Sequence, residues 1–215
     1  MHSETRLFAG GMVMLGLATS ALVVLPYVLS EPTTPAPGLR PYTQTELRGR
    51  EVYIQNGCVY CHSQQPRAKN FAPDFKRGWG RASVAGDYAY DTPHLLGTMR
   101  TGPDLLNIGA RQPSEQWQLG HLYQPRAYVP GSIMPSYPFL FEVKPEATAT
   151  DVQVFLPEEW RPASGVVVPR QGAMDLVAYL KALDRTYPAL SAQPGTKASQ
   201  PPSAATTGIN GVENR

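Results

Sequence analysis

The residues with the clearest chemistry are Cys58, Cys61 and His62, which form a Cys-x-x-Cys-His run. Two thiols at this spacing can each add to a vinyl group on one edge of a porphyrin. The histidine that follows can then take an axial position on the iron. Such a run is the attachment motif of a c-type haem. The chain has 2 cysteines, so one covalent haem c uses both.

Two other uses of a Cys-x-x-Cys pair fit this chain less well. A thioredoxin-like dithiol is expected in a βαβ context, which is not visible around Cys58. A structural zinc site needs four ligands, usually from two such pairs, and there is no second pair. The pattern therefore favours haem over a redox dithiol or a metal finger.

The second axial ligand is predicted to be Met134. It lies in the segment 128–138, where three prolines and one glycine make a stiff loop. A histidine–methionine pair favours ferrous iron and raises the reduction potential. The rival methionines are Met99 and Met174, besides those in the apolar N-terminal run. His94 or His121 would instead give bis-histidine ligation and a lower potential.

The turn Arg100–Leu105, with sequence RTGPDL, is predicted to support the axial histidine. The backbone carbonyl of Pro103 would accept the Nδ1 proton of His62, fixing the ring and raising its basicity as a ligand. With His62 and Met134 on both sides of the iron, oxygen has nowhere to bind. We therefore expect an electron-transfer protein without catalytic residues of its own.

Residues 7–29 form an uncharged apolar run. As a helix of about 35 Å, it could cross a hydrocarbon core of about 30 Å. Arg6 precedes the run, so the positive-inside rule places the N-terminus in the cytoplasm and the haem site outside. The alternative is a signal peptide cleaved near Ala18–Ser20. The net charge of +2 gives no indication of nucleic-acid binding.

The predicted fold class is mainly α, with Pro-rich loops. The expected parts are a transmembrane anchor (1–30), a Pro-rich stalk (31–43), a mono-haem domain (44–190) and a disordered tail (191–215). Helices are expected over 45–55, 114–123 and 172–187, and Gly49 would let the first cross the last. Such a pair frames a class I cytochrome c-like domain. The expected helix boundaries are Thr43 or Thr45 and Ser114 as N-caps, and Pro188 as the end of the last helix.

The stretch between the haem motif and the RTGPDL turn is basic, and one or two of its cations could pair with haem propionates. The alternatives are a solvated loop or a docking face for a partner chain. Its aromatic residues are expected to pack over the haem. Residues 140–170 suggest no function. The cations are Arg67, Lys69, Lys76, Arg77 and Arg81, and the aromatic residues are Trp79, Tyr88 and Tyr90.

The chain resembles subunit II of cbb3-type cytochrome c oxidases, the mono-haem subunit of that enzyme. The resemblance runs from about residue 5 to 190. It is carried by one N-terminal apolar run and by the segments YCHSQ, RTGPDL, PRAYVPGSIMPSYPFL and LVAYLKALDRTYP. The chain departs from the family after YCHSQ and in HLLGTM. The family's haem ligands map onto Cys58, Cys61, His62 and Met134.

The resemblance implies a single-pass protein of the bacterial inner membrane with a periplasmic haem domain. Its partners would be a haem–copper catalytic subunit, which reduces oxygen, and a further cytochrome c subunit or a soluble cytochrome c as electron donor. Two alternatives stay open. One is the equivalent subunit of a nitric oxide reductase-type complex, and the other is a free-standing, membrane-tethered cytochrome c.

Overall fold

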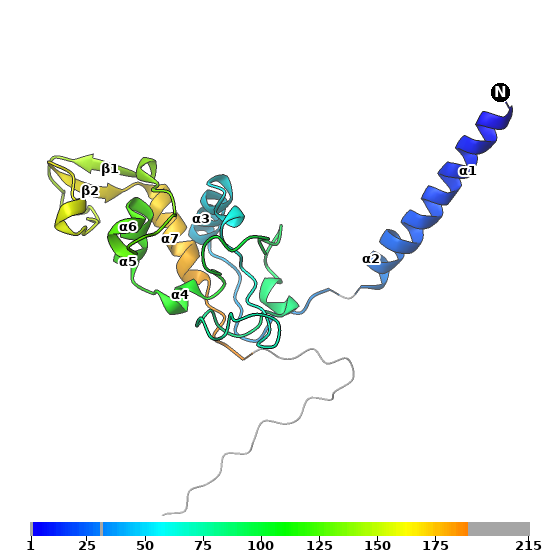
Figure 1. Ribbon diagram of the computed structural model, residues 1–215, viewed down its shortest axis with the longest axis horizontal. Coiled ribbons are helices and arrows are strands. Elements are labelled where there is room, and N and C mark those ends of the chain that lie inside the picture. Colours follow the sequence, from blue (N-terminus) through cyan, green and yellow to red (C-terminus); the bar gives the residue numbers. More distant parts are fainter. Residues whose placement is uncertain (1, 31, 189–215) are drawn as a thin grey trace, which may run out of the picture.

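The N-terminal apolar run forms one long helix in the computed structural model, which describes residues 2–30 and 32–188. Its segments are α1 (His2–Thr19), the π-helical η1 (Ser20–Val24) and α2 (Leu25–Leu29). Ser3–Leu29 has a mean hydropathy of 2.1 and could cross a membrane. Residues 3–30 are exposed, and Figure 1 shows this helix extending away from the rest of the protein.

The π-helical turn has a local cause in Pro26. A proline inside a helix removes one backbone donor, and its ring collides with the carbonyl four residues earlier. A wider turn just before Pro26 relieves that collision. The helix ends at Ser30, whose backbone N–H and hydroxyl both donate to the Pro26 carbonyl.

Helix α3 (Gln44–Gln55) leads into the haem motif, as predicted. Of the two expected caps, the structure uses Thr43, whose hydroxyl accepts from the Glu46 backbone N–H. The Glu46 carboxylate accepts from the Thr43 N–H in return, which completes a capping box. Arg40 also pairs with Glu46 at 2.5 Å. These contacts fix the direction in which the chain enters the site.

Helix α7 (Gln171–Ala182) crosses α3, and this crossing is the centre of the domain (Figure 1). The contact is so close that a Cβ at Gly49 would lie 1.8 Å from the Asp175 carbonyl oxygen. The predicted role of Gly49 is therefore confirmed. Arg48 of α3 also donates to the Asp175 carboxylate at 2.8 Å.

The prediction that the last helix continues to residue 187 is wrong. Helix α7 ends at Ala182, because the backbone groups beyond it form hydrogen bonds with another part of the chain. The Leu183 carbonyl accepts from the Gly109 N–H, and the Arg185 N–H donates to the Asn107 side chain. Tertiary hydrogen bonds thus replace the helical ones over residues 183–187, which lie between the end of α7 and Pro188.

Three short helices pack beside this pair: α4 (Ile108–Arg111), α5 (Glu115–Tyr123) and α6 (Pro125–Tyr128). The predicted N-cap of α5 is confirmed, since the Ser114 hydroxyl accepts from the Trp117 N–H. The domain core is a continuous apolar cluster of side chains from these helices and the loops between them. Its most deeply buried members are Tyr53, Leu119, Ala173, Leu176, Val177, Tyr179 and Leu183.

A two-stranded antiparallel sheet was not expected from the sequence. Strand β1 (Phe141–Lys144) pairs with β2 (Val166–Pro169), with Phe141 opposite Pro169 and Lys144 opposite Val166. Single 3₁₀ turns complete the elements: η2 (Cys58–Tyr60), η3 (Ala85–Tyr88), η4 (Pro138–Leu140) and η5 (Glu158–Trp160). The fold remains mainly helical.

The linker after the anchor joins the domain earlier than the predicted stalk of residues 31–43. Ala36 is buried, and its N–H donates to the Gly86 carbonyl at 3.0 Å. Gly38 lies against the Tyr187 ring. The extended part of the linker is therefore short. The predicted tail, residues 191–215, lies outside the residues that the structure describes.

Candidate haem site

The haem motif follows α3 through a left-handed residue, Gly57, with φ of 67°. Cys58 begins the 3₁₀ turn η2, and the N–H groups of Cys61 and His62 both donate to the Cys58 carbonyl. This turn holds Cys58 and Cys61 near each other. No disulfide joins them, since both cysteines are free. A pair of thiols on one turn, followed at once by a histidine, is what attachment to one porphyrin edge requires.

His62 is held from behind by the RTGPDL turn. Its Nδ1 lies 2.7 Å from the Pro103 carbonyl oxygen, so the contact predicted from the sequence is present. A carbonyl partner fixes the tautomer in which Nδ1 carries the proton and Nε2 is free to coordinate a metal. A Cβ at Gly102 would lie 2.3 Å from His62 Cε1. Only glycine lets this backbone come so close to the ring.

Backbone hydrogen bonds on both sides of His62 keep this contact in register. The Gly102 N–H donates to the Cys61 carbonyl at 2.9 Å, and the Leu105 N–H donates to the Ser63 carbonyl at 2.8 Å. The haem motif and the RTGPDL turn therefore form a short ladder of contacts, with the imidazole as its central member.

A buried carboxylate, Asp104, locks the same ladder. It accepts from the Ser63 hydroxyl at 2.7 Å and from the backbone N–H groups of Gln65 and Leu106 at 2.6 and 2.9 Å. Burial raises the pKa of Asp104, while these hydrogen bonds and the charge of Arg100 act against that rise. The sequence analysis did not find this residue, although it directly follows Pro103.

Arg100 connects the ladder to a more distant loop. Its guanidinium donates to the Ser63 hydroxyl, to the Gln65 carbonyl and, at 2.6 Å, to the fully buried carboxylate of Asp74. Asp74 in turn accepts from the Arg67 backbone N–H. The basic stretch after the haem motif is thus tied to the histidine side of the site.

The two thiols differ in their surroundings: Cys58 packs against the apolar core, whereas Cys61 is exposed. Burial raises the pKa of the Cys58 thiol to about 11, so Cys58 is protonated at neutral pH. Burial also raises the pKa of Tyr137, with smaller contributions from the charges of Cys58 and Cys61, which places Tyr137 near both sulfurs. Tyr137 comes from the same loop as Met134 and connects that loop to the haem motif.

The loop that carries Met134 is well anchored. The Tyr137 N–H donates to the Leu122 carbonyl, and the Met134 N–H donates to the Ser132 hydroxyl. Met134 is half-buried and packs against the domain core, as do Cys58 and Tyr137. Its neighbour Ile133 is 73% exposed. Met134 as the second axial ligand stays a prediction.

The rival histidines have other partners. His121 stacks on Trp117, with ring centroids 4.5 Å apart. Burial, and secondarily the charge of His62, lowers the pKa of His121 to about 4, so His121 is neutral at neutral pH. His94 is exposed and meets the edge of Tyr88 at 6.0 Å.

The unpaired Nε of Arg111 bears on whether the residues of this site fit a haem. Its Nε is buried without a hydrogen-bond partner, while another of its nitrogens donates to the Asp104 carbonyl. Burial lowers the pKa of Arg111. Burial also lowers the pKa of His62, and the charge of Arg111 adds to that effect. A half-buried guanidinium whose buried Nε has no partner, near the candidate axial histidine, suits a propionate, so the residues present fit the group. The sequence analysis missed Arg111.

The basic residues that the sequence analysis considered have other surroundings. Arg81 pairs with Asp87 at 2.6 Å and donates to the Tyr187 carbonyl. Of the aromatic residues in that stretch, Trp79 and Tyr88 are buried and Tyr90 is exposed. Their predicted packing over the haem stays a prediction. The other four cations, Arg67, Lys69, Lys76 and Arg77, are exposed.

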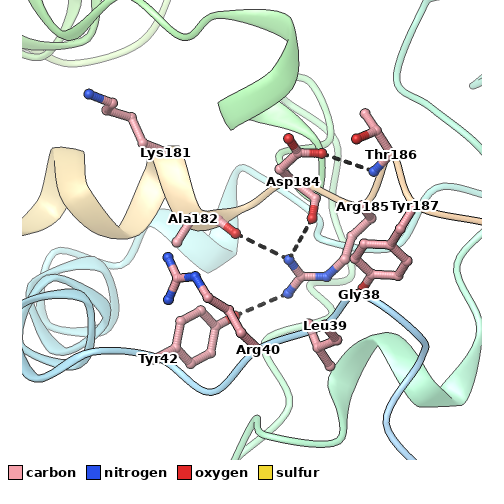
Figure 2. Close-up of a pocket in the computed structure, with 10 residues that line it drawn as sticks. All are labelled: Gly38, Leu39, Arg40, Tyr42, Lys181, Ala182, Asp184, Arg185, Thr186 and Tyr187. Atoms are coloured by element: carbon pink, nitrogen blue, oxygen red, sulfur yellow. Dashed lines mark hydrogen bonds between the residues drawn. The ribbon is translucent and has the colours of Figure 1, made fainter.

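A separate cavity of about 510 Å³ lies between the linker and the end of α7 (Figure 2). The Arg185 guanidinium points into it and donates to the Ala182 and Asp184 carbonyls and to the Tyr42 hydroxyl. No residue of the haem motif lines this cavity. Because Arg185 is occupied by protein acceptors, the cavity is a packing feature of the linker junction.

Fold and site together define a class of protein: a helical domain that carries a haem-attachment motif and follows one apolar helix consistent with a single-pass membrane anchor. The family model described as "Cytochrome C oxidase, mono-heme subunit/FixO" matches residues 2–159. The chain belongs to this family, whose members are mono-haem subunits of a multi-subunit haem–copper oxidase. One haem is therefore implied. A comparison with curated proteins gave no match.

Proposed function

We propose that this chain is the electron-relay subunit of a cbb3-type cytochrome c oxidase, equivalent to subunit II. It holds one haem c through thioether bonds to Cys58 and Cys61, with His62 and Met134 as axial ligands. It takes electrons from a further cytochrome c subunit or a soluble cytochrome c. It delivers them to the haem–copper subunit that reduces oxygen.

The proposal places the haem domain on the periplasmic side of the bacterial inner membrane, with the N-terminus in the cytoplasm. The uncharged run of residues 7–29 within the helix Ser3–Leu29, and the position of Arg6 before that run, support this orientation. The linker contact of Ala36 with Gly86 keeps the domain near the end of the helix. Such a short linker would keep the haem domain near a membrane-bound partner.

The observation that carries the proposal is the contact between His62 Nδ1 and the Pro103 carbonyl, directly after two free thiols. When bound, the haem supplies one-electron redox chemistry. The chain's own residues do the rest. Pro103 orients the imidazole, Gly102 lets the turn approach it, and the half-buried Arg111, whose Nε has no partner, would face the anionic edge of the group.

A relay function follows from ligands that fill both axial positions, because no position is then left for oxygen. Two protein ligands also keep the coordination shell the same in both oxidation states. Little reorganisation then accompanies electron transfer. Met134 comes from an anchored, proline-rich loop, which holds a weak thioether donor in place.

The test is made on the full chain in detergent, expressed with haem attached. Haem that stays on the polypeptide after denaturation in SDS, and is lost from Cys58→Ser/Cys61→Ser, supports covalent attachment. Met134→Ala should lose the far-red ferric charge-transfer band, lower the midpoint potential and bind CO when reduced. Met174→Ala is the control and should keep all three properties. An unchanged band in Met134→Ala would refute the axial assignment.

A second measurement tests the assembly. Purified in mild detergent from its native membrane, the chain should co-elute with a large polypeptide that carries b-type haem and copper. Elution as an isolated 23.5 kDa cytochrome would support the free-standing shuttle instead.

A further inference from the structure

The loop of residues 67–77, here named the cationic loop, has no part in the proposed haem site. It carries Arg67, Lys69, Lys76 and Arg77, all exposed, and its one carboxylate, Asp74, is buried. Because Asp74 is neutralised by Arg100 at 2.6 Å, the four cations on the surface of the loop are not balanced from within it.

Two large apolar side chains stand among these charges. Phe71 is 74% exposed and Phe75 is 50% exposed. The Arg67 guanidinium lies over the Phe71 ring at 5.4 Å, and the Lys69 ammonium over the Phe75 ring at 3.7 Å. The loop therefore presents aromatic rings and cations together at the protein surface.

The loop is built to hold this arrangement. Backbone N–H groups of Phe71 and Ala72 donate to the Ala68 carbonyl, and those of Arg77 and Trp79 donate to the Pro73 and Asp74 carbonyls. A salt bridge and a backbone N–H also fix Asp74 from inside. Exposed phenylalanines on an ordered loop have no structural use within the domain.

The position of the loop relative to the anchor indicates what covers it. The loop starts beside Pro66, whose carbonyl accepts from the Ser83 N–H, and three residues after Ser83 the Gly86 carbonyl accepts from the Ala36 N–H of the linker. Ala36 is seven positions after Leu29, the end of the apolar helix, and seven extended residues span at most about 25 Å. The base of the cationic loop therefore lies within reach of the membrane surface at which the apolar helix ends.

We propose that the cationic loop docks on the headgroup layer of the membrane, with Lys and Arg on anionic phospholipids and the two phenylalanines at the boundary with the acyl chains. Basic residues near a membrane surface are attracted to anionic lipid, and aromatic rings favour the interface. The apolar helix and this loop would be two separate membrane contacts. Together they set the tilt of the haem domain.

The inference does not depend on the ligands of the haem. It is tested on the full, haem-loaded chain inserted in vesicles of phosphatidylcholine alone or with about a third phosphatidylglycerol, a content high enough to give a negative surface potential. Lysines are labelled with an amine-reactive reagent and quantified by peptide mass spectrometry. Lys69 and Lys76 report on the loop. Lys144 and Lys181, on other elements and each in an ion pair, are internal controls.

Lys69 and Lys76 should label several-fold more slowly with the anionic lipid than without it, and high salt should abolish the difference. Arg67→Gln/Arg77→Gln, which keeps both reporter lysines, should reduce the protection. Arg126→Gln/Arg161→Gln, with the same loss of charge at two other exposed arginines, should not. Equal labelling in both vesicle types would overturn the proposal. So would protection that appears only when the chain is part of its native complex, since that result identifies a protein partner.

Discussion

Substitution of Asp104 should show how strongly the buried polar ladder supports the candidate haem ligand. Asp104→Ala leaves the N–H groups of Gln65 and Leu106 and the Ser63 hydroxyl without their acceptor. Each buried donor left unsatisfied costs about 1–3 kcal/mol. The hydroxyl can rotate towards another partner, so we expect a loss of about 3–5 kcal/mol. Asp104→Asn keeps one oxygen, for Leu106, and should lose about half as much.

The assay is urea unfolding of the haem-loaded chain in detergent, followed by haem absorbance and near-UV circular dichroism. A denaturant dependence of about 2 kcal/mol per molar puts the midpoint of Asp104→Ala about 2 M below that of wild type. The far-red band of the ferric form should weaken in the same variant before global unfolding, because the His62–Pro103 contact loosens first.

Asp184→Ala is the matched control. Asp184 is exposed and accepts from the neighbouring Thr186 N–H, so its loss should shift stability by less than about 0.5 kcal/mol. If Asp104→Ala unfolds at the wild-type urea concentration, or no earlier than Asp184→Ala, the reasoning from unsatisfied buried donors is refuted.

Two further predictions concern the helix crossing and the pH dependence of stability. Gly49→Ala should destabilise the domain by about 2 kcal/mol or more in urea unfolding, because the new Cβ would lie 1.8 Å from the Asp175 oxygen. Gly172→Ala, with ordinary contacts at 3.7 Å, should not, and equal midpoints would contradict this account. The lowered pKa of His121, about 4, means that only the unfolded chain binds this proton between about pH 6.5 and 4, so stability should fall as pH falls through that window, by up to about 3 kcal/mol. His121→Phe should flatten the dependence, and a profile identical to wild type would show that another group is responsible.

The features that were predicted correctly from the sequence have local causes. A Thr followed three residues later by Glu is a capping box, and α3 begins at it. Ser114 acts in the same way for α5. Gly49 was expected at a helix crossing because it is the one residue in its helix without a side chain. In each case the residue and the contact it makes lie within one helical turn or follow from its size alone.

The features that were missed depend on residues far apart in the chain. Helix α7 stops at Ala182 because Gly109 and Asn107, more than seventy residues earlier, take the next hydrogen bonds. The pairing of β1 with β2 likewise joins segments separated by a long loop. A periodic apolar pattern cannot report such competition, because it describes only which face of a helix is buried.

The candidate site shows the same division. The contact of His62 with the Pro103 carbonyl could be predicted, because a Gly-Pro turn presents a fixed carbonyl and a ligand histidine needs one. The cluster of Asp104, Arg100 and Asp74 could not, since charged side chains at these separations are usually solvated. The one available signal was the position of Asp104 directly after Pro103.

Burial decides which cation is suited to face the haem propionates. The sequence drew attention to the cationic loop, where four charges lie together, but exposed cations are already solvated by water and gain little from a new partner. Arg111 stands alone in the sequence, yet its Nε is buried without an acceptor near the axial histidine. A buried donor without an acceptor costs more free energy than several solvated cations would gain from a new partner. We therefore propose that Arg111 faces the anionic edge of the haem, which leaves the exposed charges of the loop for a different surface.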